Sequence, residues 1–175
     1  MKAEVSDTPL TWFQSQPPVL PNQMVGLWKG TGIPSGHPLD GVLENLQWFG
    51  KRFHPDMRAD ALLFQSGERR LIAVEPRWLP VRLAIRLASF GRTPVARNLF
   101  GYLRKAIRAR GQTAALQLRT LQETESAAMV YDHQPIVDYF RKINDSEVAG
   151  MMIVEADPRL YFFKLRRVDA AEVVT

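Results

Sequence analysis

Apolar and polar residues alternate along several short segments of the chain, which is the pattern of half-buried β-strands. Turn residues separate these segments, such as Pro34-Ser35-Gly36 after the first and Asp157-Pro158 before the last. Glycines within the first segment indicate a close approach of another part of the chain. The predicted strands cover residues 24–33, 61–64, 71–75, 113–122, 127–131, 147–155 and 160–168.

Apolar residues three or four positions apart predict helices in much of the remaining chain. A helix over 39–49 is expected to end at Gly50. A helix over 93–110 has Thr93 as its N-cap and Pro94 in its first turn. The predicted helices cover residues 39–49, 80–91, 93–110 and 136–143, with one more short capped helix within residues 1–22.

This arrangement of strands and helices, without regular alternation of the two, predicts an α+β fold with a mainly antiparallel sheet. Short and numerous strands protect their edges best when the sheet closes, so we expect a curved sheet or a lipocalin-like β-barrel. An N-terminal arm over residues 1–23 should precede one barrel-like domain over residues 24–175. That domain divides into residues 24–80, the cationic helices of 81–111 and residues 112–168.

The composition is that of a folded protein, since 46% of the 175 residues are apolar and 23% are charged. A chain of this length fits one domain. It contains no cysteine, which excludes disulfides, a thiolate zinc site and a cysteine nucleophile, and favours a reducing compartment. The first residues lack the apolar stretch of a signal peptide, and no apolar run is long enough to span a membrane. We therefore expect a cytoplasmic protein.

Charge is distributed unevenly along the chain. No acid occurs between Pro76 and Gln122, where ten Arg or Lys residues lie, although the net charge of the whole chain is only +5. This segment is expected to contact an anionic partner, above all a membrane surface. Nucleic acid is a less favoured partner, because few aromatic residues accompany the basic ones. A solvated basic face without any partner is the other interpretation.

The helix predicted over 93–110 is amphipathic. Its apolar stripe can pack against the sheet while its basic face meets the anionic surface. The apolar face holds Val95, Leu99, Tyr102, Leu103, Ala106 and Ile107, and the basic face holds Arg97, Arg104, Lys105 and Arg108.

Several short motifs resemble a known bacterial family. Gly26-Leu27-Trp28-Lys29-Gly30 is followed by Ser35-Gly36-His37-Pro38-Leu39-Asp40-Gly41 and by Gly50-Lys51-Arg52-Phe53. These motifs resemble the GXWXG family, and Tyr131-Asp132 with Pro135-Ile136 and Asp138 resembles its companion C-terminal domain of unknown function. The resemblance spans most of residues 24–168. It implies membership of a family and no particular activity.

A second resemblance, to lipocalins and related ligand-binding barrels, rests on the Gly-x-Trp motif of the first strand. Such barrels close one end with an Arg from the last strand, which implies that Trp28 stacks with Arg166 or Arg167. The alternative is a core tryptophan without this partner.

Catalytic and metal-binding motifs are sparse. The three histidines form no HxH, HExxH or HxxxH spacing, so we expect no metal site, and no cofactor is indicated. The absence of G-x-S-x-G, P-loop and G-x-G-x-x-G patterns argues against hydrolase, kinase and Rossmann functions. The remaining catalytic candidates are His37, Asp40 and Asp132. Helix capping is the other interpretation of both aspartates.

The leading hypothesis is that the protein binds a lipid or other small apolar ligand in an internal cavity. The alternatives are a small enzyme that uses His37, Asp40 or Asp132, and a nucleic-acid or protein adaptor that uses the basic middle segment. The residues expected to line the ligand site are Trp28, Phe53, Met129, Tyr131, Met152 and Phe163.

Overall fold

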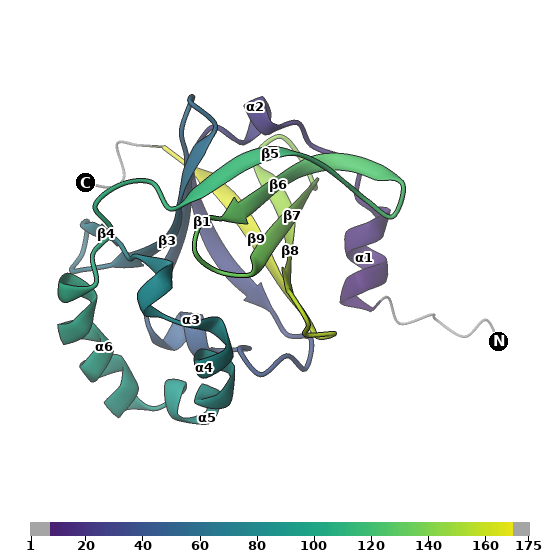
Figure 1. Cartoon of the computed structure of the whole chain (residues 1–175). Coiled ribbons are helices and arrows are strands. Elements are labelled where there is room, and N and C mark those ends of the chain that lie inside the picture. The colour runs from purple at the N-terminus through teal and green to yellow at the C-terminus, as the bar shows by residue number, and fades with distance from the viewer. Residues whose placement is uncertain (1–7, 170–175) are drawn as a thin grey trace.

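Nine strands pair antiparallel in one sheet, in the order β2-β1-β9-β8-β7-β6-β5-β3-β4. The computed structural model describes residues 8–169. Because β2 also pairs with β3, the sheet closes into a ring, and β4 adds to it at the edge of β3 (Figure 1). The predicted α+β fold with a mainly antiparallel, curved sheet is confirmed. The strands are β1 (Gly26–Ile33), β2 (Trp48–Phe53), β3 (Arg58–Gln65), β4 (Leu71–Ala73), β5 (Ala114–Leu121), β6 (Thr124–Tyr131), β7 (Ile136–Lys142), β8 (Glu147–Val154) and β9 (Leu160–Val168).

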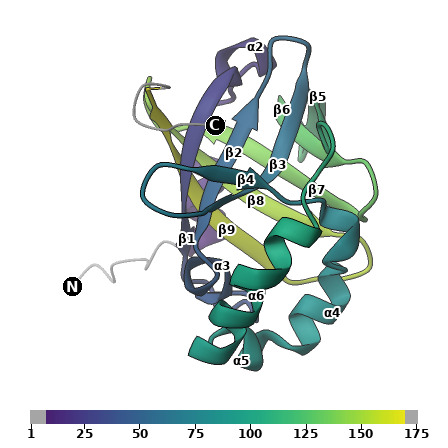
Figure 2. The same cartoon turned by 90° about the vertical axis from the view of Figure 1, so that its left-hand side faces the viewer.

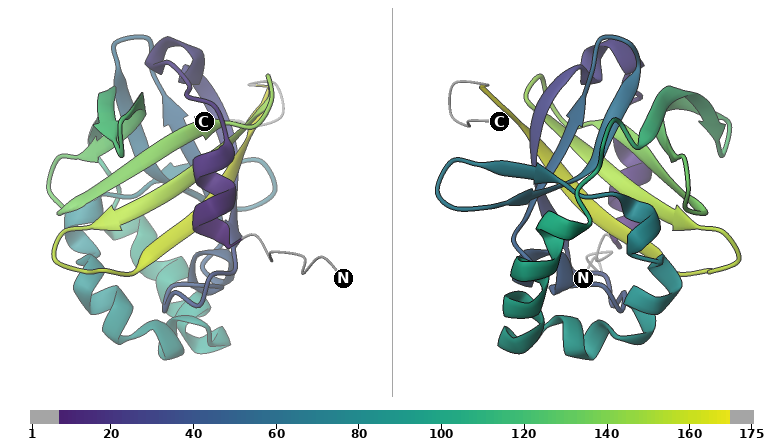
Figure 3. Two further views of the ribbon diagram at one scale, coloured as in Figure 1. Left: turned by 90° about the vertical axis from the view of Figure 1, so that its right-hand side faces the viewer. Right: turned by 60° about the vertical axis from the view of Figure 1, so that its left-hand side comes forward.

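Helices cover two parts of this ring. Four of them gather at one end, as Figures 2 and 3 show, while the first lies on the outer face of the sheet. There Phe13 packs edge-on against Phe162 of β9, with ring centroids 6.3 Å apart. Within the described residues, no helix is both long and apolar enough to cross a membrane. The helices are α1 (Pro9–Ser15), α2 (Pro21–Met24), α3 (Val42–Asn45), α4 (Val81–Arg86), α5 (Ala88–Gly91) and α6 (Pro94–Ala106), with a 3-10 turn at Pro76–Trp78.

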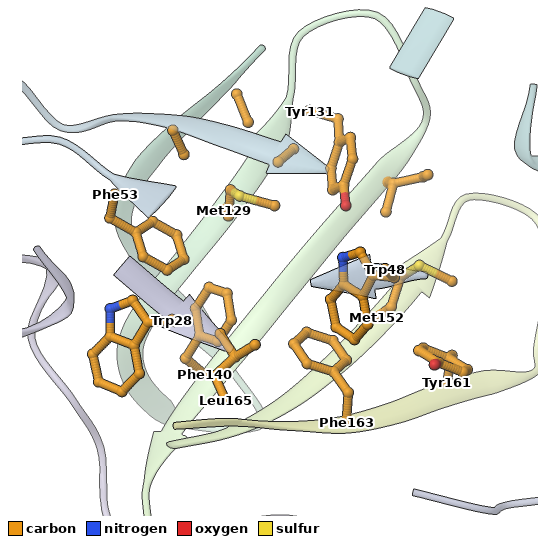
Figure 4. Packing of buried hydrophobic residues seen from close by; sticks show 14 of the residues in the cluster. Trp28, Trp48, Phe53, Met129, Tyr131, Phe140, Met152, Tyr161, Phe163 and Leu165 are labelled. Atoms are coloured by element: carbon orange, nitrogen blue, oxygen red, sulfur yellow. The ribbon is translucent and has the colours of Figure 1, made fainter. Parts of the chain in front are cut away.

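Aromatic side chains fill much of the inside of the ring (Figure 4). Phe140 and Phe163, for example, meet edge to face with centroids 6.2 Å apart. Space for these rings comes partly from glycine. A Cβ atom on Gly30 would lie 2.2 Å from the Trp48 ring, so any side chain there would displace the indole. The close approach predicted from the glycines of the first strand is therefore confirmed at Gly30.

The helix predicted over 136–143 is wrong, because these residues form β7. Ile136, Asp138 and Phe140 are buried, whereas Val137 and Tyr139 are partly exposed, as expected for a strand with one face on the core. A buried aspartate at an inward-facing position interrupts the apolar alternation by which a strand is recognised. The apolar residues of this segment also recur at helical spacing, and the helix was predicted from that spacing.

The helix predicted over 39–49 is much shorter, since α3 ends at Asn45 and the chain continues into β2. Gly50, the expected helix cap, lies instead where the pairing of β2 with β3 shifts register. Its φ is +152°, and a Cβ atom there would lie 2.0 Å from the carbonyl oxygen of Trp28, so glycine is required. The irregularity allows both Trp48 and Lys51 to reach the inside of the ring.

Most other predicted elements are confirmed with small changes in length. The Thr93 side chain accepts a hydrogen bond from the Ala96 N–H group at 3.2 Å, so it caps α6 as expected, although α6 ends at Ala106 and not at 110. The final hairpin of β8 and β9 lies within one residue of the prediction. β3 begins at Arg58, before the predicted start at 61.

Candidate functional site

A cavity of about 130 Å³ lies inside the ring, at the end that the helices cover. Side chains of α3, α4, the 3-10 turn and the loops next to them form one wall, and side chains of six strands form most of the rest. The wall is mostly apolar, with Trp48, Leu62, Phe64, Met152 and Phe163 among its residues. Its polar side chains are few and specific: Lys51, Tyr131, Gln134, Asp138 and Tyr161.

Lys51 and Asp138 form a buried ion pair in the wall of this cavity. Lys51 Nζ lies 2.8 Å from Asp138 Oδ2, and neither side chain is more than 3% exposed. Nζ also donates to the carbonyl of Ala61 at 3.0 Å and to the hydroxyl of Tyr131 at 3.2 Å, so each of its three N–H groups has an acceptor. The Tyr131 hydroxyl donates in turn to Asp138 Oδ2 at 3.3 Å. The three side chains come from β2, β6 and β7, which the closed ring brings together.

Burial dominates the electrostatics of the site. It raises the pKa of Asp138, and the ion pair with Lys51 and the hydrogen bond from Tyr131 oppose this shift only in part. Burial, and then the negative charge of Asp138, raises the pKa of Tyr131 well above its ordinary value. The Lys51 ammonium lies between 5.4 and 5.8 Å from the ring centroids of Trp48, Tyr131 and Phe163, whose faces favour a cation.

Two polar atoms of the wall have no hydrogen-bond partner among residues 8–169. They are Oδ1 of Asp138 and the hydroxyl of Tyr161. Tyr161 is almost fully buried, and burial together with the negative charge of Glu44 raises its pKa. A buried polar group left unpaired costs about 1–3 kcal/mol. A polar group on a bound molecule would therefore be most stabilised beside these two atoms.

The cavity is built jointly by two segments that match known families. Residues 11–68 match the family described as GXWXG protein, and residues 112–167 match a domain of unknown function (DUF4334). The GXWXG match thus lies in the first part of the chain, and the DUF4334 match lies in the last part. Lys51 lies in the first segment, and Tyr131 and Asp138 lie in the second. Residues 69–111, which include α4 to α6, lie outside both matches.

The chain is also similar to a solved structure, that of a protein from Thermomonospora curvata. The two structures superpose with a TM-score of 0.64 at 29% sequence identity, and the match covers 90% of this chain and 83% of that chain. None of the curated proteins matches the chain. The sequence matches are to the two families, and the structural match is to a protein with the same overall fold.

The residues expected to bind a ligand are divided between the two ends of the ring. One group lines the cavity and the other packs the opposite part of the interior, as Figure 4 shows. The lining group is Tyr131, Met152 and Phe163, and the packed group is Trp28, Phe53 and Met129.

Trp28 contacts an arginine of the last strand, and that arginine is Arg167. Its guanidinium carbon lies 4.3 Å from the centroid of the indole. The same guanidinium donates to the carbonyls of Val25 and Gln23, each at 2.6 Å. Arg166 is exposed and forms no such stack. The Trp28–Arg167 contact thus fastens the beginning of β1 to the end of β9, away from the cavity.

His37 and Asp40 do not form a pair of side chains. Asp40 Oδ2 accepts hydrogen bonds from the backbone N–H groups of Ser35, Gly36 and His37 at 2.9, 2.9 and 3.1 Å, so it fixes the loop before α3 and does not cap the helix. His37 Nδ1 accepts from the Leu39 N–H group at 3.1 Å, and burial lowers the pKa of the imidazole. Neither side chain lines the cavity.

Asp132 lies apart from the cavity as well. It forms an ion pair with Arg58 near the surface, and one of the two hydrogen bonds between them is 3.1 Å long. The helix that it was expected to cap does not exist, because the following segment is β7. No cluster of three or more His, Asp or Glu side chains that could hold a metal ion is found in residues 8–169.

Sequence reasoning did not assign Lys51 and Asp138 to the site, although both lie within the motifs that carry the family resemblance. The available signal was a charged residue at an inward-facing position of a strand. It could not be recognised, because neither β2 nor β7 was predicted as a strand. Lys51 was hidden by the irregularity at Gly50, and Asp138 by the helical spacing around it.

A second apolar hollow, of about 260 Å³, lies outside the ring between α4, α5 and α6. Its floor and the wall of the inner cavity share four residues, Val42, Leu46, Leu79 and Ala84. These side chains therefore stand between the cavity and the outer hollow.

α6 is rotated relative to the orientation expected from the sequence. Its buried residues are Ala96 and Phe100, and the Phe100 ring meets Phe64 of β3 with centroids 4.7 Å apart. Part of the stripe that was expected to pack on the sheet, including Leu99 and Tyr102, is exposed instead.

The four residues expected to form the basic face of this helix differ in their contacts. Arg97 donates to the backbone carbonyl of Asn45 at 3.0 Å and to its side-chain oxygen at 2.9 Å. Arg104 donates to a backbone carbonyl at the end of β3. Lys105 and Arg108 are exposed. Two of the four thus hold α6 in place, Arg97 against α3 and Arg104 against β3.

Proposed function

We propose that the protein binds a small, largely apolar molecule, such as a lipid-derived or aromatic alcohol, in the inner cavity. The observation that supports this most is the unpartnered Oδ1 of Asp138 in an otherwise apolar wall. Ligand sites typically combine an apolar lining with a few polar groups that fix orientation. A hydroxyl that donates to Asp138 would remove the cost of the unpaired acceptor.

The volume of the cavity limits the size of the ligand. At about 130 Å³ it is close to an engineered cavity of about 150 Å³ that binds benzene. It therefore fits one ring or a short branched chain. A longer tail would extend past Leu46 and Ala84 into the outer hollow.

The charge of the site favours a neutral donor over a carboxylate. All three N–H groups of Lys51 already have acceptors within the protein. A carboxylate placed here would lie beside the carboxyl of Asp138 with no cation free to neutralise it. Alcohols are thus better ligands for this cavity than fatty acids.

We predict that 4-methylphenol binds at least about tenfold more tightly than para-xylene, in which a methyl group replaces the hydroxyl, because a hydrogen bond to a charged acceptor contributes about 1.5–3 kcal/mol net. Isothermal titration would measure both affinities. Native mass spectrometry and organic extraction of the purified protein would identify any ligand that it carries.

A cavity-blocking variant provides the control. Ala84→Trp places an indole where the cavity meets the outer hollow and is expected to abolish uptake, whereas Ala106→Trp adds the same group at an exposed position of α6 and should not. Equal uptake by both variants, or no uptake by the unaltered protein, would refute a ligand site in this cavity.

An acid–base enzyme is the second candidate function, and the raised pKa of Asp138, which is buried in a mostly apolar site, favours it. In that case Asp138 would exchange a proton with the bound molecule, and Tyr131 would orient the carboxyl. Incubation in deuterated water distinguishes the two functions. Deuterium on a ligand carbon, lost in Asp138→Asn, indicates an enzyme, and a ligand recovered unchanged indicates a binding protein.

A further inference from the structure

We propose that the outer side of α4, α5 and α6, with the 3-10 turn before them, docks onto an anionic phospholipid membrane. This surface, called the helical face below, gathers most of the large apolar side chains that are exposed within residues 8–169. The proposal does not depend on the identity of the cavity ligand. The exposed apolar residues of the helical face are Trp78, Leu83, Leu87, Phe90, Val95, Leu99, Tyr102 and Leu103.

The degree of exposure is unusual for residues of this size. Tyr102 is 82% exposed, Val95 64% and Trp78 59%. Single exposed apolar residues are common on soluble proteins, but a contiguous group marks an interaction surface. Here the group follows three consecutive helices at one end of the ring (Figures 2 and 3). Six of the eight side chains, all except Val95 and Tyr102, also line the outer hollow. Val95 and Tyr102 lie on α6 with Leu99 and Leu103, which do line it.

Basic residues accompany these apolar side chains, and acidic residues do not. Arg82, Arg86 and Lys105 are exposed on α4 and α6, and no acid occurs in the sequence between Pro76 and Gln122. None of the basic residues in this segment takes part in a salt bridge within the described part of the chain. The helical face therefore carries positive charge that its own protein does not neutralise.

The combination favours a membrane over other partners. Helices with exposed Leu, Phe and Trp beside Arg and Lys bind in the interfacial region, where the apolar side chains enter the lipid and the basic ones remain among anionic headgroups. A second copy of the chain would place two surfaces of the same charge together. A nucleic acid would attract the basic residues but would leave the apolar ones in water.

The position of the inner cavity agrees with this orientation. The outer hollow opens on the helical face and is separated from the cavity by Val42, Leu46, Leu79 and Ala84. With the helical face on a bilayer, an apolar molecule could pass from lipid to the cavity without crossing bulk water. The helical face, the outer hollow and the inner cavity thus lie next to one another, in that order.

Sedimentation with vesicles tests the proposal on the full chain. Vesicles of phosphatidylcholine alone are compared with an equimolar mixture of phosphatidylcholine and phosphatidylglycerol. We expect binding to the mixture that weakens as salt increases. Each basic residue near an anionic surface strengthens binding roughly fivefold. The variant Arg82→Gln/Arg86→Gln/Lys105→Gln should therefore bind about a hundredfold more weakly.

A matched variant controls for net charge. Lys29→Gln/Arg119→Gln/Arg166→Gln removes three exposed positive charges elsewhere on the protein and should retain most of the binding. A second variant, Val95→Ser/Leu99→Ser/Tyr102→Ser, removes exposed apolar area that would otherwise enter the lipid. It should bind the mixed vesicles at least about tenfold more weakly than the unaltered protein. Circular dichroism melting confirms that each variant is folded.

Three results would overturn the proposal. The first is equal sedimentation with both kinds of vesicle, or with neither. The second is equal binding by the two charge variants. The third is self-association of the unaltered protein that the apolar variant abolishes, which would assign the helical face to contact between copies of the chain.

Discussion

Replacing Lys51 by methionine is expected to lower the free energy of unfolding by about 3–5 kcal/mol, because it leaves the Asp138 carboxyl buried without a counterion. The pair is in direct contact, at 2.8 Å, and is almost completely buried. The double variant Lys51→Met/Asp138→Leu should recover most of this loss, since apolar residues often replace a buried ion pair at little cost. Urea unfolding of the three proteins measures the difference.

The loss of unfolding free energy in Lys51→Met should also depend on pH. The folded-state pKa of Asp138 is already raised, and without Lys51 the largest opposing influence is gone. A carboxyl with a raised folded pKa contributes its full stability below the unfolded pKa and loses it as pH rises through the folded pKa. Relative to the unaltered protein, Lys51→Met should thus be less stable at about pH 8 than at about pH 5.

An exposed ion pair provides the comparison. Lys164 lies 3.0 Å from Glu147, and these side chains are 43% and 23% exposed. Lys164→Met removes the same kind of partner but should cost less than about 1 kcal/mol, because solvent screens the charge that remains. If the two lysine variants were equally stable, burial of the Lys51–Asp138 pair would not have the effect assigned to it.

The same two residues explain why the sequence predicted some strands and not others. β8 and β9 were recognised as apolar segments that meet at the Asp157-Pro158 turn, and most of their residues are buried because the core covers one face and α1 packs on the other. In β7 a buried Asp138 occupies an inward position, and in β2 a buried Lys51 follows the irregularity at Gly50. Local pattern and final fold disagree most where polar side chains are held inside for the site.

The orientation of α6 was beyond prediction for a different reason. Its apolar residues cover so wide an arc that more than one face could have been the buried one. Which face packs is decided by contacts distant in sequence, such as Phe100 with Phe64 and Arg97 with Asn45. The amphipathic pattern predicted the helix and its cap correctly, but it carries no information about these partners.

Replacing Trp28 by alanine is expected to lower the free energy of unfolding by about 3–5 kcal/mol, the cost typical of a buried aromatic residue. The indole is 1% exposed, donates to the Met24 carbonyl at 2.6 Å and lies under the Arg167 guanidinium. Its loss leaves a cavity at the end of the ring away from the ligand site. It also removes the ring face that stabilises the guanidinium. Thermal and urea unfolding should show the change.

A second tryptophan separates this structural role from a role in binding. Trp78 is 59% exposed and its ring lies 5.1 Å from the guanidinium of Arg77, so Trp78→Ala should change stability by about 0.5 kcal/mol or less. Because Trp28 does not line the cavity, Trp28→Ala should keep its affinity for 4-methylphenol at temperatures where it is folded. An unchanged melting temperature, with affinity lost, would instead place Trp28 in the ligand site and contradict the packing described for this end of the ring.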